Sequence, residues 1–221
     1  LKEKIINFAS TDKLISTATR YMGIFPILTR VDVGHIIPRE NSSQRAAMLW
    51  HKDNFGFKSL DLFMIINNVD EGNGPLYVME KKIHAGVLKS FINPKNARTG
   101  ERGKVSISEF DKVFTNEKII KLDGNSGNAL LIDSFSAYHR GGYCKNRERI
   151  MMRFCYQSVD ALCDESFYKK KNYFHFNDRI LNNGNLNIFK KYLFFKKPSY
   201  FVKYISKLTT KFYSLIEYKY N

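Results

Sequence analysis

Short stretches of alternating apolar and polar residues, separated by turn residues, recur through much of the sequence. In Ile27–Ile37 and Arg149–Ser158 the alternation has a period of two, which is typical of strands with one buried face. Asp70–Pro75 and Asp123–Gly127 are rich in the Gly, Asn and Asp residues that form tight turns. The pattern predicts a mainly β fold, a barrel or a sandwich. Further strands are expected at 46–53, 58–69, 76–82, 118–122 and 128–134.

Helices are expected at both ends of the chain and once within it. Leu1–Gly23 has apolar residues at intervals that suit one or two short helices, with Gly23 as the stop. Ser108–Phe114 predicts a further short helix. After Pro198, aromatic and aliphatic residues recur at helical spacing among lysines, which predicts an amphipathic basic helix. We therefore expect one domain over residues 1–165 and a basic, aromatic-rich helical extension over residues 166–221.

The net charge of +15 is concentrated in this extension. From Ser166 onward the chain contains eleven Lys and one Arg but only two acidic residues, Asp178 and Glu217. Ten of the fifteen net positive charges therefore lie there. A strong basic balance suggests nucleic acid or an anionic membrane as a partner. Because residues 1–165 carry only +5, we expect no nucleic-acid partner for the domain. For the C-terminal helix, ordinary packing with snorkelling lysines and peripheral contact with an anionic membrane are the two alternatives.

Several features favour a cytoplasmic protein. No run approaches the roughly 18 apolar residues of a transmembrane helix, and the stretch that begins at Leu1 has no signal-peptide anatomy. Cys144, Cys155 and Cys163 are odd in number and lack zinc-type spacing, so we expect reduced thiols. The sequence leaves the oligomeric state open.

The segment Trp50-His51-Lys52-Asp53 carries the chemistry that stands out. His51 and Asp53 are two residues apart, so on an extended strand both side chains leave the same face. His139, from a later segment, would add a second imidazole. Two histidines and one carboxylate form the ligand triad of non-haem iron(II) sites, which leaves positions open for oxygen chemistry. His-x-Asp alone is a weak signal, so its meaning depends on the rest of the chain.

Further motifs follow in a fixed order: an apolar strand that ends in Asn-Val-Asp, an Asn-Gly-Pro-Leu turn, a Gly-rich turn with an apolar strand, His-Arg-Gly-Gly, and Arg-Glu-Arg at the start of a strand. They lie at 68–70, 73–76, 123–133, 139–142 and 147–149. From about Arg45 to Ser158 this order resembles the phytanoyl-CoA dioxygenase family of Fe(II)- and 2-oxoglutarate-dependent oxygenases. The resemblance implies a double-stranded β-helix, the jelly-roll or cupin-like barrel, with flanking N-terminal helices.

The resemblance also implies roles for individual residues. His51, Asp53 and His139 would be the catalytic metal ligands, with 2-oxoglutarate and O2 as co-substrates at the open positions. The reaction would yield succinate and CO2 and hydroxylate a small organic substrate. Arg149 would bind the distal carboxylate of 2-oxoglutarate through its planar fork. Arg153 is the runner-up, because it shares a strand face with Arg149 by parity, and Arg147 is a further alternative.

The chain departs from the family in two places, one of which is the position of the arginine: family members often have it one residue further after the second histidine than Arg149 is after His139. The stretch Met79–His84 stands where family members usually have a Pro-Gly-Ser-His-like sequence, so the substrate entrance is expected to differ. The intact Asp53 argues against the halogenase branch. Two other functions stay open: a nucleic-acid oxidative demethylase, suggested by the charge and by arginines six residues apart at 147 and 153, and a non-catalytic module that binds a membrane or a partner.

The remaining residues of note are expected to have structural or minor roles. Trp50 is expected in the core, because parity points it away from the candidate ligands. His35 is expected to be an ordinary strand residue, and His84 and His175 to lie on the surface. Asn67 and Tyr77 are minor candidates for lining the substrate pocket.

Overall fold

The computed structural model describes residues 2–38, 46–53, 58–80 and 104–158, and these form a mainly β fold with two N-terminal helices. The elements are, in chain order, α1 (Lys2–Ala9), α2 (Asp12–Met22), β1 (Ile27–Ile36), a 3-10 turn (Ala46–Met48), β2 (Ser59–Ile65), β3 (Leu76–Met79), α4 (Ile107–Val113), β4 (Ile119–Leu122), β5 (Ala129–Ile132), β6 (His139–Gly141) and β7 (Arg149–Gln157).

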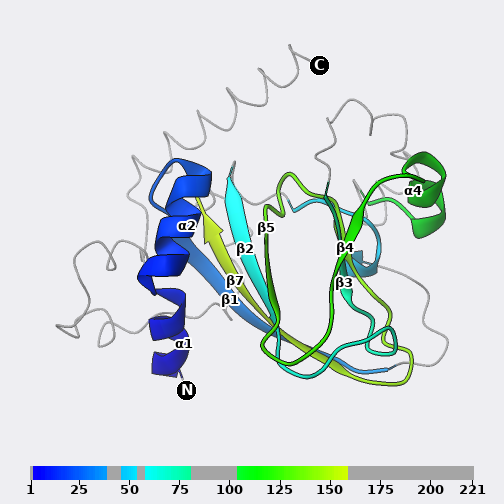
Figure 1. The fold of residues 1–221 in the computed structure, drawn as a ribbon, viewed down its shortest axis with the longest axis horizontal. Helices are drawn as coiled ribbons and strands as arrows, with labels where there is room; N and C mark the ends of the chain where they lie inside the picture. Colours follow the sequence, from blue (N-terminus) through cyan, green and yellow to red (C-terminus); the bar gives the residue numbers. More distant parts are fainter. Residues whose placement is uncertain (1, 39–45, 54–57, 81–103, 159–221) are drawn as a thin grey trace, which may run out of the picture. The chain divides into compact units, whose positions relative to one another are not determined.

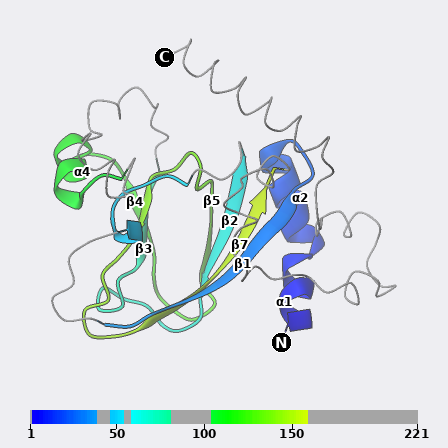
Figure 2. The ribbon, with the colours of Figure 1, turned by 180° about the vertical axis from the view of Figure 1, so that it is seen from behind.

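The strands form two sheets. One has the order β1-β7-β2-β5 (Figure 1). The other has the order β4-β3-β6. In the three-stranded sheet, β3 runs antiparallel to both neighbours, and Val78 lies opposite His139 in the register. The view from behind shows β1, β7 and β2 in the same neighbouring order (Figure 2).

The chain divides into two units. The first, called here the helical unit, comprises the described residues of 1–32, 55–61 and 154–158. The second, called the β-rich unit, comprises the described residues of 33–54 and 62–153. All candidate site residues belong to the β-rich unit.

In the helical unit, α1 and α2 are fixed by apolar faces and by backbone contacts. The buried residues of α2 are Ile15, Ala18 and Met22, which recur at helical spacing. Gly23 ends α2 with φ +71°, and its N–H donates to the carbonyl of Thr19. The predicted stop at Gly23 is therefore confirmed. The hydroxyl of Tyr156 in β7 donates to the carbonyl of Ala9 over 2.7 Å and so connects the sheet to α1.

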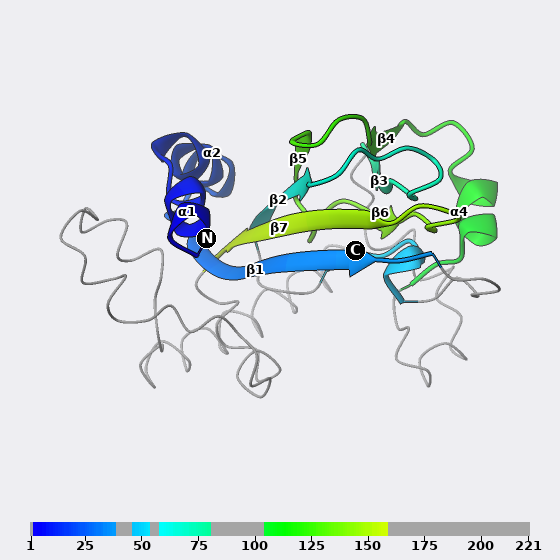
Figure 3. The same cartoon turned by 90° about the horizontal axis from the view of Figure 1, so that it is seen from below.

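In the β-rich unit, β3 contributes to two separate cores because its side chains alternate between the two faces. Leu76 and Val78 pack in a cluster with residues of β2, β4 and β5: Phe63, Ile65, Val69, Leu122 and Ile132. This cluster therefore joins strands of both sheets. On the other face, Tyr77 and Met79 pack against a cluster that also contains Trp50, Val105, Phe110 and Tyr138. Figure 3 shows β3 and β4 side by side.

The predicted strands at 27–37, 58–69, 76–82, 118–122, 128–134 and 149–158 are confirmed with shorter bounds, and so is the helix at 108–114. That helix begins at a capping box between Ser106 and Glu109. The C-terminal helix and the extension over residues 166–221 lie outside the described residues. In the described part of the chain, no helix is long and apolar enough to cross a membrane.

The predicted strand over 46–53 is wrong. Ala46–Met48 forms a 3-10 turn, and two single bridges follow it, Trp50 with Val105 and His51 with His139. Consecutive residues thus pair with different partner segments, and no ladder can form. The short strand β6 was not predicted as a strand, because it has three residues, ends at Gly141 and carries no alternating pattern.

Two glycines allow the segment before β3 to approach the segment after β6. A Cβ on Gly74 would lie 2.5 Å from the backbone of Tyr143, and a Cβ on Gly142 would lie 2.5 Å from the backbone of Gly74. The N–H of Gly142 donates to the carbonyl of Pro75 over 2.7 Å. No side chain fits between these two backbones, so both positions require glycine.

We expect Gly74→Ala to destabilise the protein strongly, because the substitution combines a backbone clash with a strained φ of +65°. Gly127→Ala is the matched control, since Gly127 has φ +92° but open space around its Cβ position. Backbone strain alone costs about 1–3 kcal/mol, so urea unfolding should show a clearly larger loss for Gly74→Ala. Equal losses for the two variants would contradict the close backbone approach.

Candidate metal centre

His51, Asp53 and His139 converge within the β-rich unit. Their nearest ligand atoms all lie within 4.8 Å of one another. His51 Nε2 lies 3.8 Å from Asp53 Oδ1, and His139 Nε2 lies 3.8 Å from Asp53 Oδ2. Ligands bound at about 2.0–2.2 Å from one ion are separated by no more than about 4.4 Å. The two histidine–carboxylate separations fit that limit, and the bound of 4.8 Å for all three atoms exceeds it by only a few tenths of an ångström, so a small adjustment would let the three side chains hold a single metal ion.

Backbone hydrogen bonds bring the three residues together. His51 and His139 each donate an N–H to the other's carbonyl, both over 3.0 Å. Asp53 donates its N–H to the carbonyl of Ser134 over 2.8 Å, in the segment between β5 and β6. The two imidazole ring centroids are consequently only 4.4 Å apart.

Each imidazole is also oriented by a carbonyl two residues earlier in the chain. His51 Nδ1 lies 2.8 Å from the carbonyl oxygen of Leu49, and His139 Nδ1 lies 3.1 Å from that of Ala137. A carbonyl oxygen can only accept, so in both rings Nδ1 carries the proton. Each Nε2 then presents its lone pair toward Asp53, which is how a histidine ligand is prepared for a metal.

Burial sets the protonation of the two imidazoles. Burial, together with the nearby His51, lowers the pKa of His139 from 6.5 to about 4. Burial also lowers the pKa of His51, against the opposing effect of Asp53. Both rings are therefore neutral at pH 7, and a neutral imidazole is the form that binds metals.

Arg153 stabilises the charged form of Asp53. Burial alone would raise the pKa of the Asp53 carboxyl, but Arg153 and the imidazoles outweigh burial and lower this pKa below its usual range. Arg153 Nη2 donates to Asp53 Oδ2 in a close ion pair and lies 3.4 Å from Ser134 Oγ. The carboxylate is therefore ionised and available as a ligand at neutral pH.

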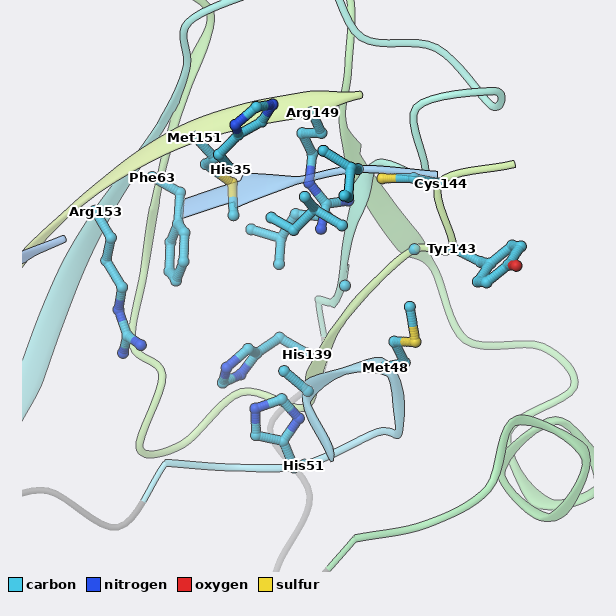
Figure 4. A pocket seen from close by; sticks show the side chains of 16 residues that line it. His35, Met48, His51, Phe63, His139, Tyr143, Cys144, Arg149, Met151 and Arg153 are labelled. Atoms are coloured by element: carbon cyan, nitrogen blue, oxygen red, sulfur yellow. The ribbon is translucent and has the colours of Figure 1, made fainter. Parts of the chain in front are cut away.

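The candidate centre opens into a cavity of about 460 Å³. His51 and His139 lie on one side of it, with Arg149 and Met151 across from them (Figure 4). Most of the other lining residues are apolar or glycine; the full set is His35, Ile36, Ile37, Ala47, Met48, His51, Phe63, Leu76, His139, Gly141, Gly142, Tyr143, Cys144, Arg149, Met151 and Arg153.

Arg149 is a buried cation in this cavity. The residue is only 4% exposed, and its Nε and Nη1 have no hydrogen-bond partner among the described residues. Burial lowers its pKa. Gly141 leaves space for the guanidinium, because a Cβ there would lie 3.1 Å from Arg149 Nη2. Buried donors without acceptors are costly, so this guanidinium suits an anionic ligand that enters the cavity.

Arg147, the further alternative, does not line the cavity. Its side chain is exposed and ion-paired with Asp70. Arg147 and Arg153, the pair that suggested a demethylase, therefore do not share the cavity.

The minor candidates also lie elsewhere. The side-chain amide of Asn67 donates to the carbonyl of Glu148 and accepts from the N–H of Ile150, next to the start of β7. Tyr77 lies on the opposite face of β3, where its hydroxyl donates to Glu71 over 2.8 Å. Trp50 stacks on Phe110 with a centroid separation of 4.2 Å, as expected for a core residue.

Several lining residues were not singled out from the sequence. Met151 could have been found, because it lies on β7 between Arg149 and Arg153 and has the same parity. His35 was interpreted as an ordinary strand residue; it lies in β1 and also lines the cavity, with its Nε2 2.7 Å from Glu148. Phe63 could not be found by alternation, because both faces of β2 are largely buried and the pattern does not show which face borders the cavity.

The chain matches no protein-family model and no curated protein. Solved structures with a similar arrangement include AviO1 from Streptomyces viridochromogenes Tue57, at 16% identity and a TM-score of 0.42, covering 69% of this chain and 60% of that one. EctD from S. alaskensis, solved with 2-oxoglutarate and 5-hydroxyectoine, has 15% identity and a TM-score of 0.49, covering 70% and 52%. The non-heme alpha ketoglutarate dependent epimerase SnoN has 12% identity and a TM-score of 0.47, covering 70% and 58%. The chain thus spans between about half and three fifths of the length of these structures.

We expect the metal-free protein to lose stability as the pH falls from about 6.5 to about 4. The unfolded chain takes up a proton at His139 near pH 6.5, whereas the folded chain does so only near pH 4. The unfolded state therefore binds more protons in this range and is favoured, by roughly 3 kcal/mol.

Urea unfolding at several pH values in the presence of a chelator measures this loss. His139→Gln should flatten the pH dependence, because the variant lacks the buried imidazole. An unchanged slope in His139→Gln would show that His139 titrates normally.

Proposed function

We propose that the protein is an Fe(II)- and 2-oxoglutarate-dependent oxygenase that hydroxylates a small organic molecule and releases succinate and CO2. Its metal ligands are His51, Asp53 and His139, and Arg149 binds the distal carboxylate of 2-oxoglutarate. The observation that carries the proposal is a His-Asp-His cluster whose two histidines line the same cavity as a buried arginine, with Nε and Nη1 of that arginine lacking partners among the described residues.

The donor set fits this metal. Two neutral imidazoles and one carboxylate on one side of an ion are the facial triad of non-haem iron(II) oxygenases and leave open positions. When bound, iron would supply the activation of O2 while 2-oxoglutarate is oxidised. The protein's own residues have narrower tasks: the triad would hold the ion, and the carbonyls of Leu49 and Ala137 orient the imidazoles.

The buried arginine fits the co-substrate. A carboxylate in the cavity would accept hydrogen bonds from the guanidinium of Arg149 and would itself lie beside a buried cation. One charge-assisted pair would then offset the desolvation costs of both groups. Met151 and Phe63 flank this region and leave apolar surface for a substrate.

The same proposal covers the wider assignments. We propose a place in or near the phytanoyl-CoA dioxygenase family, a double-stranded β-helix for the β-rich fold, a catalytic domain over residues 1–165 and a cytoplasmic location. The basic extension over 166–221 is proposed as a helical appendage that contacts other parts of the protein or an anionic membrane. These assignments are supported by the order of the sequence motifs and by the charge distribution.

We expect Fe(II) and 2-oxoglutarate, added anaerobically to the full chain, to produce the visible charge-transfer absorption of a 2-oxo acid chelated to ferrous iron. His51→Ala and Asp53→Ala should abolish the band, because each removes a ligand. Arg149→Gln should keep iron binding but weaken 2-oxoglutarate at least about ten-fold, as expected for the loss of a buried charge-assisted pair.

Arg147→Gln is the matched control, since this exposed arginine lies outside the cavity, and it should bind both ligands like the wild type. Iron binding without any response to 2-oxoglutarate would contradict the oxygenase proposal. Failure to bind iron at all would favour the non-catalytic alternative.

A further inference from the structure

The second arginine of the cavity, Arg153, contacts the proposed metal centre directly. Its Nη2 donates to Oδ2 of Asp53, the oxygen that lies 3.8 Å from His139 Nε2. The same nitrogen lies 3.4 Å from Ser134 Oγ, and Ser134 accepts the backbone N–H of Asp53. Ser134 therefore contacts both Arg153 and Asp53 and holds the two residues next to each other.

Packing fixes the guanidinium in this place. Its central carbon lies 4.9 Å from the centroid of the Phe63 ring, in cation–π geometry. Arg153 is on the same face of β7 as Arg149, so one strand presents two cations to one cavity (Figure 4). Their surroundings differ: Arg153 has a carboxylate partner, whereas Nε and Nη1 of Arg149 have no acceptor among the described residues.

The ion pair has two consequences for a metal. Arg153 occupies one oxygen of Asp53 and leaves Oδ1, which lies 3.8 Å from His51 Nε2, as the oxygen free to coordinate. A guanidinium at this distance from the carboxylate also repels a divalent cation bound to the same group, and it competes with that cation for negative charge.

We propose that Arg153 is a positioning residue that holds Asp53 in place before the metal arrives and restricts it to one coordinating oxygen, at the expense of metal affinity. This inference rests on the metal binding proposed above. Arg153 thus takes the place of the cation in the metal-free protein, and the triad is formed before the ion binds. The cost is that the ion must bind the carboxylate beside a like charge, which weakens its attraction to Asp53.

The first claim, that Arg153 holds Asp53 in place, is tested by thermal unfolding at pH 8 with a chelator present to keep the protein free of metal. The imidazoles are neutral at this pH. Arg153→Met leaves a largely buried carboxylate without its partner and should lower Tm by about 5–10 °C. Arg153→Lys keeps the charge and should recover part of this loss. Arg149→Met is the matched control: it removes a buried cation whose Nε and Nη1 have no acceptor among the described residues, so Tm should stay the same or rise. A loss in Arg149→Met as large as that in Arg153→Met would overturn the assigned difference.

Titration with Co(II), followed by its visible absorption, tests the second half. Arg153→Met should bind Co(II) at least about ten-fold more tightly than the wild type, because the competing cation is gone. A residue with only a structural role would give the opposite result, since a disordered carboxylate binds more weakly. Equal or weaker binding in Arg153→Met, with normal binding in the wild type, would overturn this inference alone. A wild type that binds no Co(II) would overturn both this inference and the proposed function.

Discussion

The candidate centre depends on a single pair of backbone hydrogen bonds, those between His51 and His139. The two residues are far apart in sequence, and neither belongs to a long ladder at this point: His51 forms an isolated bridge, and β6 has three residues. Because the bridge is reciprocal, it fixes the relative position of both main chains and thus of both Cβ atoms. Asp53 follows two residues later and is fixed by its own backbone bond to Ser134. Side-chain geometry at the centre is therefore largely a consequence of main-chain pairing.

The sequence allowed the strands and the ligand triad to be predicted for different reasons. The period-two alternation of β1 and β7 reflects burial on one face, which is a local property of the chain. The triad was predicted from residue types and motif order, and the convergence of the three side chains agrees with it. The regular strand expected at 46–53 failed because Trp50 and His51 pair with different segments, and such a choice of partner is made by tertiary structure.

The roles of the two cavity arginines show where sequence reasoning ends. Parity correctly put Arg149 and Arg153 on one face of β7, but parity cannot say which acceptor each side chain meets. That depends on the carboxylate of Asp53, which reaches Arg153 from another segment, and on the space that Gly141 leaves beside Arg149. The result is one arginine paired with a carboxylate and, on the same strand, one whose Nε and Nη1 lack acceptors among the described residues.

The mutual contact of Gly74 and Gly142 also determines how the cavity can change. Part of its wall, at Gly141 and Gly142, is backbone without side chains. The backbone of Gly142 is already packed against that of Gly74. Such a wall has no side chain to shorten, so substitution there can only fill space. Any enlargement of the cavity must come from shortening side chains elsewhere in its lining, such as Met48 and Met151. The cavity can therefore be widened only where side chains line it.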